Sequence, residues 1–332
     1  MRFAITGASG LIGRALTLKL ADQGHDVVAI YRSQVPPAFL HHTNIHCLQG
    51  DVMDKAFLIK AFQNTDGVFH LAAFAKPWSK DKLVYYRINE QGTENVANAC
   101  LTAGVKRMVF TSSAGTHGPQ VGTQRVDERT WPDTYHTDYE QSKFNALQKA
   151  FSFEEKGLEV NAVSPARVYG VGDVSESNVP VRMMQIYLRY KVGLVPASGV
   201  GIGSYVFMDD VVNGHLIAMN KTPSGEEFLL GGENLSYLEF FDRIAEVSGK
   251  KHPVLKIPYS LSLGIGKAQL FAAENFGISP TITAPWVRKY TKNWGVSSEK
   301  IETYGYTITP LAEGMEKVFE YLNRRKNLGV NP

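Results

Sequence analysis

The chain has 332 residues, 44% of them hydrophobic and 20% charged, which is ordinary for a soluble globular protein of one or two domains. Its formal net charge of +3 is small for this length and gives no reason to expect nucleic acid or an anionic membrane surface as a partner. Two cysteines are too few for a disulfide framework or a cysteine zinc site, so we expect no metal and a reducing, cytoplasmic location.

Short apolar runs alternate with helix-like stretches through the first half of the chain, which is typical of βαβ units and a parallel sheet. In the first helical stretch Leu16 and Leu20 share one face, and Gly24 marks the end of the helix. The predicted fold class is therefore α/β, with a Rossmann-type doubly wound parallel sheet. We predict strands at 2–5, 27–31, 44–48, 67–72, 106–111 and 159–164, and helices at 11–23, 53–62, 85–103 and 138–156.

The pattern changes after Pro165, where we expect a smaller C-terminal α/β substrate domain. Ser236 and Glu239 form a capping box that predicts a helix start, because each side chain can satisfy an exposed amide. The most apolar stretch, 257–273, is broken by serine, glycine and lysine, so we expect no membrane span. Further predictions are a loop at 170–178, helices at 179–191, 209–220 and 237–248, and strands at 205–208 and 226–230. We assign residues 1–167 with the returning segment 204–232 to a dinucleotide-binding Rossmann domain, and residues 168–203 and 233–332 to a substrate-binding domain.

A glycine-rich turn joins the first predicted strand to the first helix. Gly7 permits the tight turn, Gly10 removes a Cβ that would keep a pyrophosphate from the helix N-terminus, and Gly13 lets helix and strand pack closely. The spacing is G-x-x-G-x-x-G, and its place in a βαβ unit predicts a dinucleotide site rather than a purely structural turn. Ser9, Leu11 and Ile12 complete the segment that we expect to contact the cofactor.

The residues at the end of the second strand, Tyr31, Arg32 and Ser33, bear on the choice between NADP(H) and NAD(H). A carboxylate at this place would hold the hydroxyls of the adenosine ribose, and none is present. Arg32 can stack on adenine and bind a 2′-phosphate, and Ser33 can donate a hydrogen bond to that phosphate. We therefore predict a preference for NADP(H), with NAD(H) as the alternative if Arg32 is only an exposed surface residue.

Two further strand ends supply candidate cofactor contacts. After the third strand, Asp51 can accept a hydrogen bond from the adenine amino group while Val52 packs on the ring. Asp51 would serve equally well as the N-cap of the next helix. The fourth strand ends in Leu71, Ala72 and Ala73, and the small side chains there let the cofactor lie against the sheet.

Tyr139 and Lys143 lie four residues apart, so the predicted helix places them on one face. An ammonium beside a phenol favours the phenolate, and we expect Lys143, together with a positively charged nicotinamide, to lower the pKa of Tyr139 from its usual value near 10. Tyr139 would then act as general acid or base between an alcohol and a ketone, while Lys143 also bonds the nicotinamide ribose. Taken alone, such a pair is more often an ordinary surface pair.

Hydroxyl residues supply the third part of the predicted reaction centre. Thr111, Ser112 and Ser113 lie at the carboxyl end of the predicted strand 106–111, at the edge where open α/β sheets bind ligands. We count Thr111 among the cofactor contacts. The Ser113 hydroxyl would face the nicotinamide and could bond the substrate oxygen as charge develops on it.

These segments occur in an order that resembles a known enzyme family. Together with Asn89, Gly92-Thr93 and Pro165-Ala166-Arg167-Val168-Tyr169-Gly170, they resemble the extended short-chain dehydrogenase/reductase superfamily, also called the NAD-dependent epimerase/dehydratase family. The resemblance implies that Ser113, Tyr139 and Lys143 are the catalytic residues and that Pro165 and Val168 lie beside the nicotinamide. It also implies a homodimer with a four-helix interface formed by the helices at 85–103 and 138–156.

The chain departs from the members of this superfamily that act on nucleotide sugars. Those usually carry an arginine just before the strand that here includes Tyr205, and residues 201–204 contain no basic side chain. The segments 227–236 and 257–259 and the motif at 111–116 resemble instead the dihydroflavonol-reductase and 3β-hydroxysteroid-dehydrogenase-like branch.

Three functions remain as hypotheses. The first is an NAD(P)-dependent oxidoreductase that transfers a hydride between nicotinamide C4 and a secondary alcohol or ketone of a largely apolar small molecule. The second is a nucleotide-sugar epimerase or dehydratase that retains its NAD. The third is an NADP(H)-sensing regulatory protein on the same fold, against which the intact set of Ser113, Tyr139 and Lys143 argues.

Overall fold

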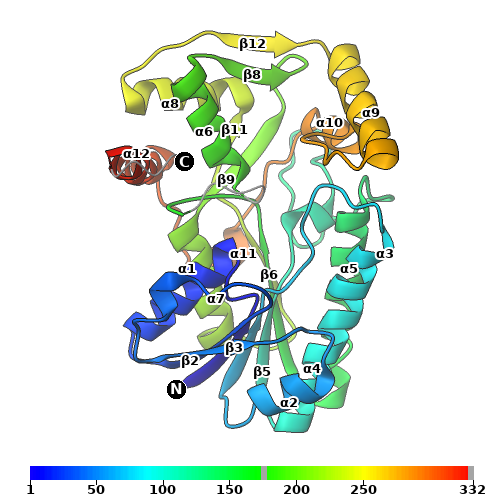
Figure 1. The fold of residues 1–332 in the computed structure, drawn as a ribbon, viewed down its shortest axis with the longest axis vertical. Helices are drawn as coiled ribbons and strands as arrows, with labels where there is room; N and C mark the ends of the chain where they lie inside the picture. Colours follow the sequence, from blue (N-terminus) through cyan, green and yellow to red (C-terminus); the bar gives the residue numbers. More distant parts are fainter. Residues whose placement is uncertain (173–177, 328–332) are drawn as a thin grey trace.

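The larger part of the molecule is a seven-stranded parallel sheet with helices on both faces (Figure 1). The computed structural model describes residues 1–172 and 178–327. The strand order β10-β6-β5-β4-β1-β2-β3 is that of a doubly wound, Rossmann-like sheet, so the predicted fold class is confirmed. Every neighbouring pair of strands in this sheet runs parallel. The strands are β1 (Arg2–Thr6), β2 (Asp26–Tyr31), β3 (Ile45–Gln49), β4 (Gly67–His70), β5 (Arg107–Thr111), β6 (Glu159–Pro165) and β10 (Glu227–Leu230).

Alternate residues of each strand point to opposite faces of the sheet, which defines its two helical layers. Phe3 and Ile5 of β1 join a core on one face, whereas Ala4 joins a separate core on the other. Both faces are buried, which explains why the strands are almost continuously apolar. The first core includes residues of α1 (Leu11–Asp22), α7 (Met208–Asn220) and α11 (Glu299–Glu302), and the second includes residues of α2 (Lys55–Ala61), α4 (Gly92–Ala103) and α5 (Asp138–Phe151).

The remaining elements form a second, smaller part that lies over the carboxyl ends of the strands (Figure 1). A three-stranded sheet contains β7 (Arg167–Tyr169), β9 (Ile202–Phe207) and β11 (Glu233–Ser236), and β8 (Gly193–Pro196) pairs with β12 (Val254–Ile257). The third core lies among α6 (Val179–Tyr190), α8 (Tyr237–Ser248) and α12 (Leu311–Asn327). α9 (Tyr259–Phe276) and α10 (Ala284–Tyr290) pack on each other. The residue boundaries of the two domains stay a prediction.

The predicted helix at 85–103 is present, but it is not α-helical throughout. It begins as α3 (Leu83–Tyr85), passes through a π-helical turn at Tyr86–Gln91 and continues as α4. Asn89 lies in this turn, and its side-chain amide donates to the Phe74 carbonyl and to Ser142 Oγ at 3.2 and 2.9 Å and accepts from Phe74 N at 2.7 Å. The wider turn therefore directs an amide toward the loop after β4 and toward α5, which an apolar pattern cannot predict.

Other boundaries differ in the same local way. The helix predicted at 138–156 ends at Phe151, and a separate 3-10 turn follows at Glu154–Lys156. The capping box of Ser236 and Glu239 is present. The apolar stretch 257–273 belongs to α9, and none of the helices that the structure describes has the length and apolar character to cross a bilayer. Residues 173–177 of the predicted loop lie outside the described residues. The sequence pattern does not predict β7, β8, β11, β12, α9, α10 or α11.

Candidate active site

The glycine turn between β1 and α1 is shaped to bring backbone amides to an anion. Gly7 has φ +70°, and a Cβ there would lie 2.7 Å from Ala72 N. A Cβ at Gly13 would lie 2.2 Å from the Gly7 carbonyl oxygen, so α1 packs directly on the turn. Gly10 is the N-cap of α1, and a Cβ there would contact only Gly7 O, at 3.2 Å. The space over the helix N-terminus is therefore open to a pyrophosphate, and Ser9 is exposed beside it.

The ends of β2 and β3 provide the surroundings expected for an adenosine group. Tyr31 is partly buried, while Arg32 and Ser33 are exposed. Within the part of the chain that the structure describes, no carboxylate pairs with the Arg32 guanidinium. Asp51 accepts from Met53 N at 2.9 Å, but α2 is capped by the Asp54 side chain. The alternative role of Asp51 as the N-cap of this helix is therefore wrong.

Buried hydrogen bonds hold the end of β4, the strand that leads into Leu71, Ala72 and Ala73. His70 Nδ1 lies 2.7 Å from Thr6 Oγ1, and its Nε2 lies 2.9 Å from Thr93 Oγ1. Burial, with a smaller contribution from Lys143, lowers the pKa of His70 to about 3, so the imidazole is neutral. The strand end is thus tied both to β1 and to α4.

The structure brings Ser113, Tyr139 and Lys143 together at the carboxyl end of β5. Lys143 donates from Nζ to the Thr111 carbonyl at 2.6 Å and lies 4.2 Å from the centre of the Phe110 ring. Ser113 lies close enough to the Tyr139 hydroxyl to lower its pKa, and Ser113 Oγ accepts from Gly115 N at 3.2 Å. Residues far apart in sequence therefore form one cluster of a phenol, an ammonium and a hydroxyl.

Burial dominates the electrostatics of this cluster. It raises the pKa of Tyr139 to about 12; the Ser113 side chain acts in the opposite direction, and Glu140 adds to the increase. Burial also lowers the pKa of Lys143 to about 7. Lys143 alone therefore does not lower the pKa of Tyr139, because residue spacing does not reveal the cost of burying a phenolate, and the lowering expected from Lys143 together with a positively charged nicotinamide stays a prediction.

An ion pair that the sequence does not predict lies beside the cluster. Lys289 Nζ of α10 lies 2.6 Å from Glu140 Oε1, and the side chains are 13% and 1% exposed. The same ammonium lies 3.1 Å from the position of a Cβ on Gly115, and Ser113 Oγ lies 3.3 Å from that position. Lys289, a residue of the second part of the molecule, thus places its ammonium beside the reaction centre. No sequence signal could have paired residues 149 positions apart.

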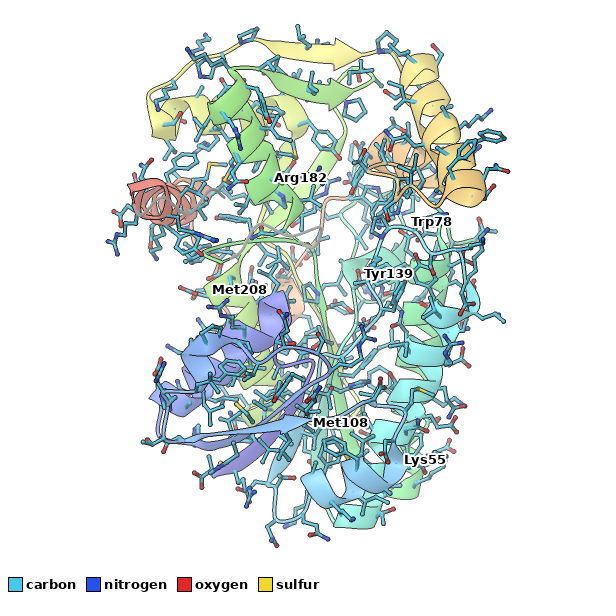
Figure 2. All side chains as sticks on the ribbon, viewed as in Figure 1. Lys55, Trp78, Met108, Tyr139, Arg182 and Met208 are labelled. Carbon is cyan, nitrogen blue, oxygen red and sulfur yellow. The ribbon has the colours of Figure 1, made fainter. Side chains whose placement is uncertain are left out.

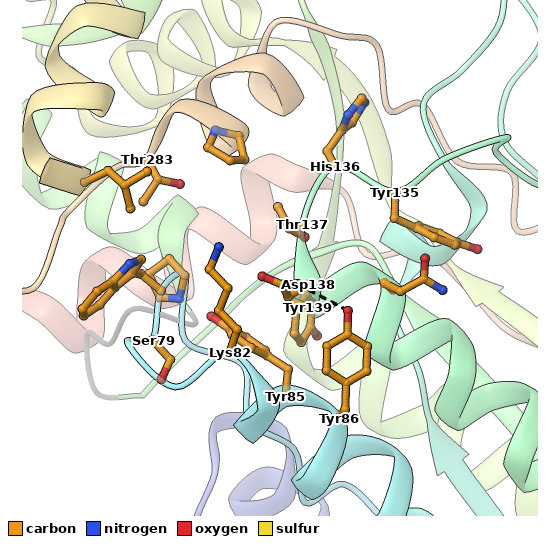
Figure 3. A pocket seen from close by; sticks show the side chains of 15 residues that line it. Ser79, Lys82, Tyr85, Tyr86, Tyr135, His136, Thr137, Asp138, Tyr139 and Thr283 are labelled. Carbon is orange, nitrogen blue, oxygen red and sulfur yellow. Dashed lines mark hydrogen bonds between the residues drawn. The ribbon is translucent and has the colours of Figure 1, made fainter. Parts of the chain in front are cut away.

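A cavity of about 350 Å³ adjoins Tyr139 where the two parts of the molecule meet. Figure 3 shows Tyr85, Tyr86, Tyr135 and His136 around it, with the Tyr86 hydroxyl donating to Asp138 Oδ1 at 3.3 Å. Figure 2 places Tyr139 below Trp78, near this boundary. The lining residues are Pro77, Trp78, Ser79, Lys82, Tyr85, Tyr86, Tyr135, His136, Thr137, Asp138, Tyr139, Gln141, Leu270, Thr283 and Pro285.

Metal ligation has no candidate in the described ranges. No group of three or more His, Cys, Asp or Glu side chains is placed there to hold a metal ion. The polar groups near Tyr139 are hydroxyls, cations and the carboxylates of Asp138 and Glu140, which suit hydrogen bonding and proton transfer.

Comparison with known proteins relates this chain to an enzyme family. The family model described as "NAD dependent epimerase/dehydratase family" matches residues 3–231. A candidate dihydroflavonol 4-reductase of Synechocystis sp. is 30% identical over 86% of this chain and 84% of its own length. Sterol demethylase protein B of Methylococcus capsulatus is 31% identical over 80% of each chain. A 2-alkyl-3-oxoalkanoate reductase of Stenotrophomonas maltophilia is 27% identical over 80% of this chain and 81% of its own.

Solved structures share the fold over nearly the whole chain. The crystal structure of gox2253 has a TM-score of 0.81 and 25% identity, and the similarity covers 97% of this chain and 98% of that chain. MoeE5, solved in complex with UDP-glucose and NAD, has a TM-score of 0.78 and 23% identity, with 98% and 100% covered. At that identity, the likeness to MoeE5 supports the fold alone.

Proposed function

The chain belongs to the NAD-dependent epimerase/dehydratase family of enzymes, and we propose that it is an oxidoreductase for a secondary alcohol or ketone of a largely apolar small molecule. The observation that carries the proposal is the cluster of Ser113, Tyr139 and Lys143 at the carboxyl end of β5. The glycine turn at the neighbouring strand end supplies an open helix N-terminus for a dinucleotide.

In the proposed reaction Tyr139 moves the proton and Ser113 holds the oxygen. A bound nicotinamide cofactor supplies or accepts the hydride at C4. The Tyr139 hydroxyl, protonated at neutral pH, donates its proton to the ketone oxygen during reduction, while Ser113 Oγ donates a hydrogen bond to the same oxygen. One hydrogen of the Lys143 ammonium is fixed on the Thr111 carbonyl, which leaves others for the nicotinamide ribose.

We assign the cofactor contacts to the strand ends around this cluster. The exposed Arg32 and Ser33, with no carboxylate at the end of β2, support NADP(H) as the preferred cofactor. Pro165 at the end of β6 and Val168 in β7 would lie beside the nicotinamide. The remaining assigned contacts are Gly7, Ser9, Gly10, Leu11, Ile12, Gly13, Tyr31, Asp51, Val52, Leu71, Ala72, Ala73 and Thr111.

The relatives support a carbonyl compound as the substrate. Their names include a 3-oxoalkanoate reductase and a sterol demethylase protein, and residues 201–204 contain no basic side chain. We therefore favour an apolar alcohol or ketone over a nucleotide sugar. The cavity beside Tyr139 is our candidate for part of the substrate site.

Replacing Tyr139 by phenylalanine tests the proposal. We expect the Tyr139→Phe variant to lose nearly all turnover of ketones with NADPH and to keep nearly normal cofactor affinity, since only the proton-transferring hydroxyl is removed. Tyr190→Phe, the same change at an exposed residue of α6, is the matched control. Near-normal turnover in Tyr139→Phe would rule out the assigned role. If a broad carbonyl panel gave no oxidoreduction while NADPH altered binding of another protein, a regulatory function would be supported instead.

We also propose a homodimer, on the basis of the family resemblance. Its interface would be a four-helix arrangement of α4 and α5 with their copies. Light scattering coupled to gel filtration would measure the mass, and a monomer at micromolar concentration would contradict the proposal.

A further inference from the structure

A guanidinium near the boundary of the two parts has aromatic neighbours but no ionic partner. Arg167 begins β7, and its guanidinium carbon lies 4.9 Å from the ring centre of Tyr237, 5.6 Å from that of Tyr205 and 5.7 Å from that of Tyr290. Nη1 donates to the Tyr205 hydroxyl at 3.3 Å. Across residues 1–172 and 178–327, no carboxylate forms an ion pair with Arg167. A guanidinium is always charged and has five N–H donors, so most of its hydrogen-bonding capacity is unused.

The surrounding chain makes room for this charge. Gly203 of β9 faces it, and a Cβ at that position would lie 2.2 Å from Nη1. Tyr237 is 4% exposed, and its hydroxyl, which lies near the guanidinium, is a buried polar atom without a partner in good hydrogen-bonding geometry. Among the described residues, the buried Tyr237 hydroxyl has no acceptor in good geometry, and the guanidinium has no carboxylate although it donates to the Tyr205 hydroxyl. These two observations point independently to an oxygen-rich ligand.

Helix α10 connects this aromatic cage with the reaction centre. Tyr290 in its wall follows directly after Lys289, whose ammonium borders Gly115 and Ser113. Glu140 already neutralises that lysine, whereas nothing described neutralises Arg167. Arg167 itself follows Pro165 by two residues and is partly exposed, so a ligand could reach it. The cage and the reaction centre are thus linked through α10, which supplies Tyr290 to one and Lys289 to the other.

We propose that Arg167 binds the carboxylate of an oxo- or hydroxy-acid substrate and so holds the reacting carbon against Tyr139 and Ser113. This inference rests on the proposed function and names its substrate class. The planar fork of a guanidinium matches the two oxygens of a carboxylate, and the three rings suit the apolar chain that carries it. The Tyr237 hydroxyl supplies a further donor to the same anion.

The test measures binding of decanoate and of 1-decanol to the full-length protein with NADP⁺ by titration calorimetry. We expect the wild type to bind decanoate and the Arg167→Met variant to bind it about 10- to 100-fold more weakly, the range for losing a hydrogen-bonded charge pair. Binding of 1-decanol should be the same in both proteins. Arg189→Met, at an exposed arginine of α6, is the matched control and should bind decanoate normally.

Two further variants keep the test decisive. Arg167→Lys retains the charge without the fork and should recover only part of the affinity. If Arg167→Met fails to fold, Gly203→Ala displaces the guanidinium without removing it and should weaken decanoate binding alone. Absence of decanoate binding by the wild type, or equal binding by Arg167→Met, would overturn the proposal.

Turnover separates this inference from the proposed function. Wild type should oxidise 3-hydroxydecanoate with NADP⁺ more efficiently than its methyl ester, and Arg167→Met should lose that preference through KM. Equal oxidation of acid and ester by both proteins would overturn the carboxylate site and leave the hydride reaction intact. Loss of decanoate binding in Arg167→Met without any oxidation would support the site and contradict the function. Arg167-dependent binding of UDP in place of decanoate would show that the anion is a diphosphate and overturn the carboxylate assignment.

Discussion

Breaking the ion pair between Glu140 and Lys289 should destabilise the protein more than its single contact suggests. The two side chains are 1% and 13% exposed and 2.6 Å apart, so each compensates a charge that water cannot solvate. Glu140 also accepts from the Thr137 hydroxyl at 3.1 Å and from His136 N at 3.2 Å. Removing one partner of a buried pair costs about 3–5 kcal/mol, because the other charge stays buried.

The two single changes are not equivalent. In Glu140→Gln the remaining ammonium lies 4.9 and 4.7 Å from the ring centres of Trp286 and Trp294, and such contacts offset about 1 kcal/mol. We therefore expect Glu140→Gln to lower the free energy of unfolding by about 2–4 kcal/mol. Lys289→Met should lower it by about 3–5 kcal/mol, because the Glu140 carboxylate keeps only its two hydrogen-bond donors.

Urea denaturation followed by circular dichroism at neutral pH measures these differences. The double variant, Glu140→Gln with Lys289→Met, should cost less than the sum of the two single changes, by a coupling energy of about 2–3 kcal/mol. Lys317→Met, which removes one member of the exposed pair with Glu313, is the control and should cost less than about 1 kcal/mol. If Glu140→Gln and Lys289→Met lowered the free energy of unfolding no more than Lys317→Met does, the reasoning would be refuted.

The remaining predictions concern cofactor choice and pH. Arg32→Ala should lower kcat/KM for NADPH about 10- to 100-fold and change kcat/KM for NADH little; an equal loss with both cofactors would contradict binding of the 2′-phosphate. Because the pKa of Tyr139 is raised to about 12, kcat/KM for alcohol oxidation should rise with pH to at least about 9; an oxidation optimum below neutral pH would exclude Tyr139 as the base. Burial lowers the pKa of His70 to about 3 and of His215 to about 4. Below about pH 6.5 the unfolded chain therefore binds more protons than the folded protein, and the free energy of unfolding decreases as the pH is lowered. At about pH 5 the decrease for the two histidines together is about 4 kcal/mol. Urea midpoints at both pH values measure this loss, and His215→Gln should remove about half of it; an unchanged midpoint would show that these rings are not buried neutral.

The first half of the fold could be predicted because its signals are local. Strand β1, the glycine turn and α1 follow one another within residues 2–22, and each leaves its own periodicity or spacing in the sequence. Position 7 has a positive φ, which glycine adopts readily, so the presence of glycine in the sequence indicates this turn. The second half was harder, since β7, β8 and β11 are short and their partners lie far along the chain. Strands of three or four residues carry too few alternations for a pattern to be read.

In the candidate site, too, the local features could be predicted from the sequence and the long-range contacts could not. The spacing of Tyr139 and Lys143 on one helical turn, and the position of Ser113 at a strand end, were predictable because helix and strand geometry fix them locally. The direction of the Tyr139 pKa shift was not, because it depends on how much surrounding protein removes water from the phenol. Lys289 and the cage around Arg167 were also beyond prediction, since they join β7, β9, α8 and α10.

The sequence by itself determined the Rossmann-type sheet, the dinucleotide turn and the residue types available for proton transfer, because these depend on periodicity and on spacings shorter than one structural unit. Only the tertiary structure decided what lies over them. It paired Glu140 with Lys289, placed Arg167 against Gly203 with no ionic partner among the described residues, and set the burial that fixes which groups are charged. The physical reason is that desolvation and ionic pairing depend on distance in space, and the sequence of one segment does not indicate which distant segment will pack against it.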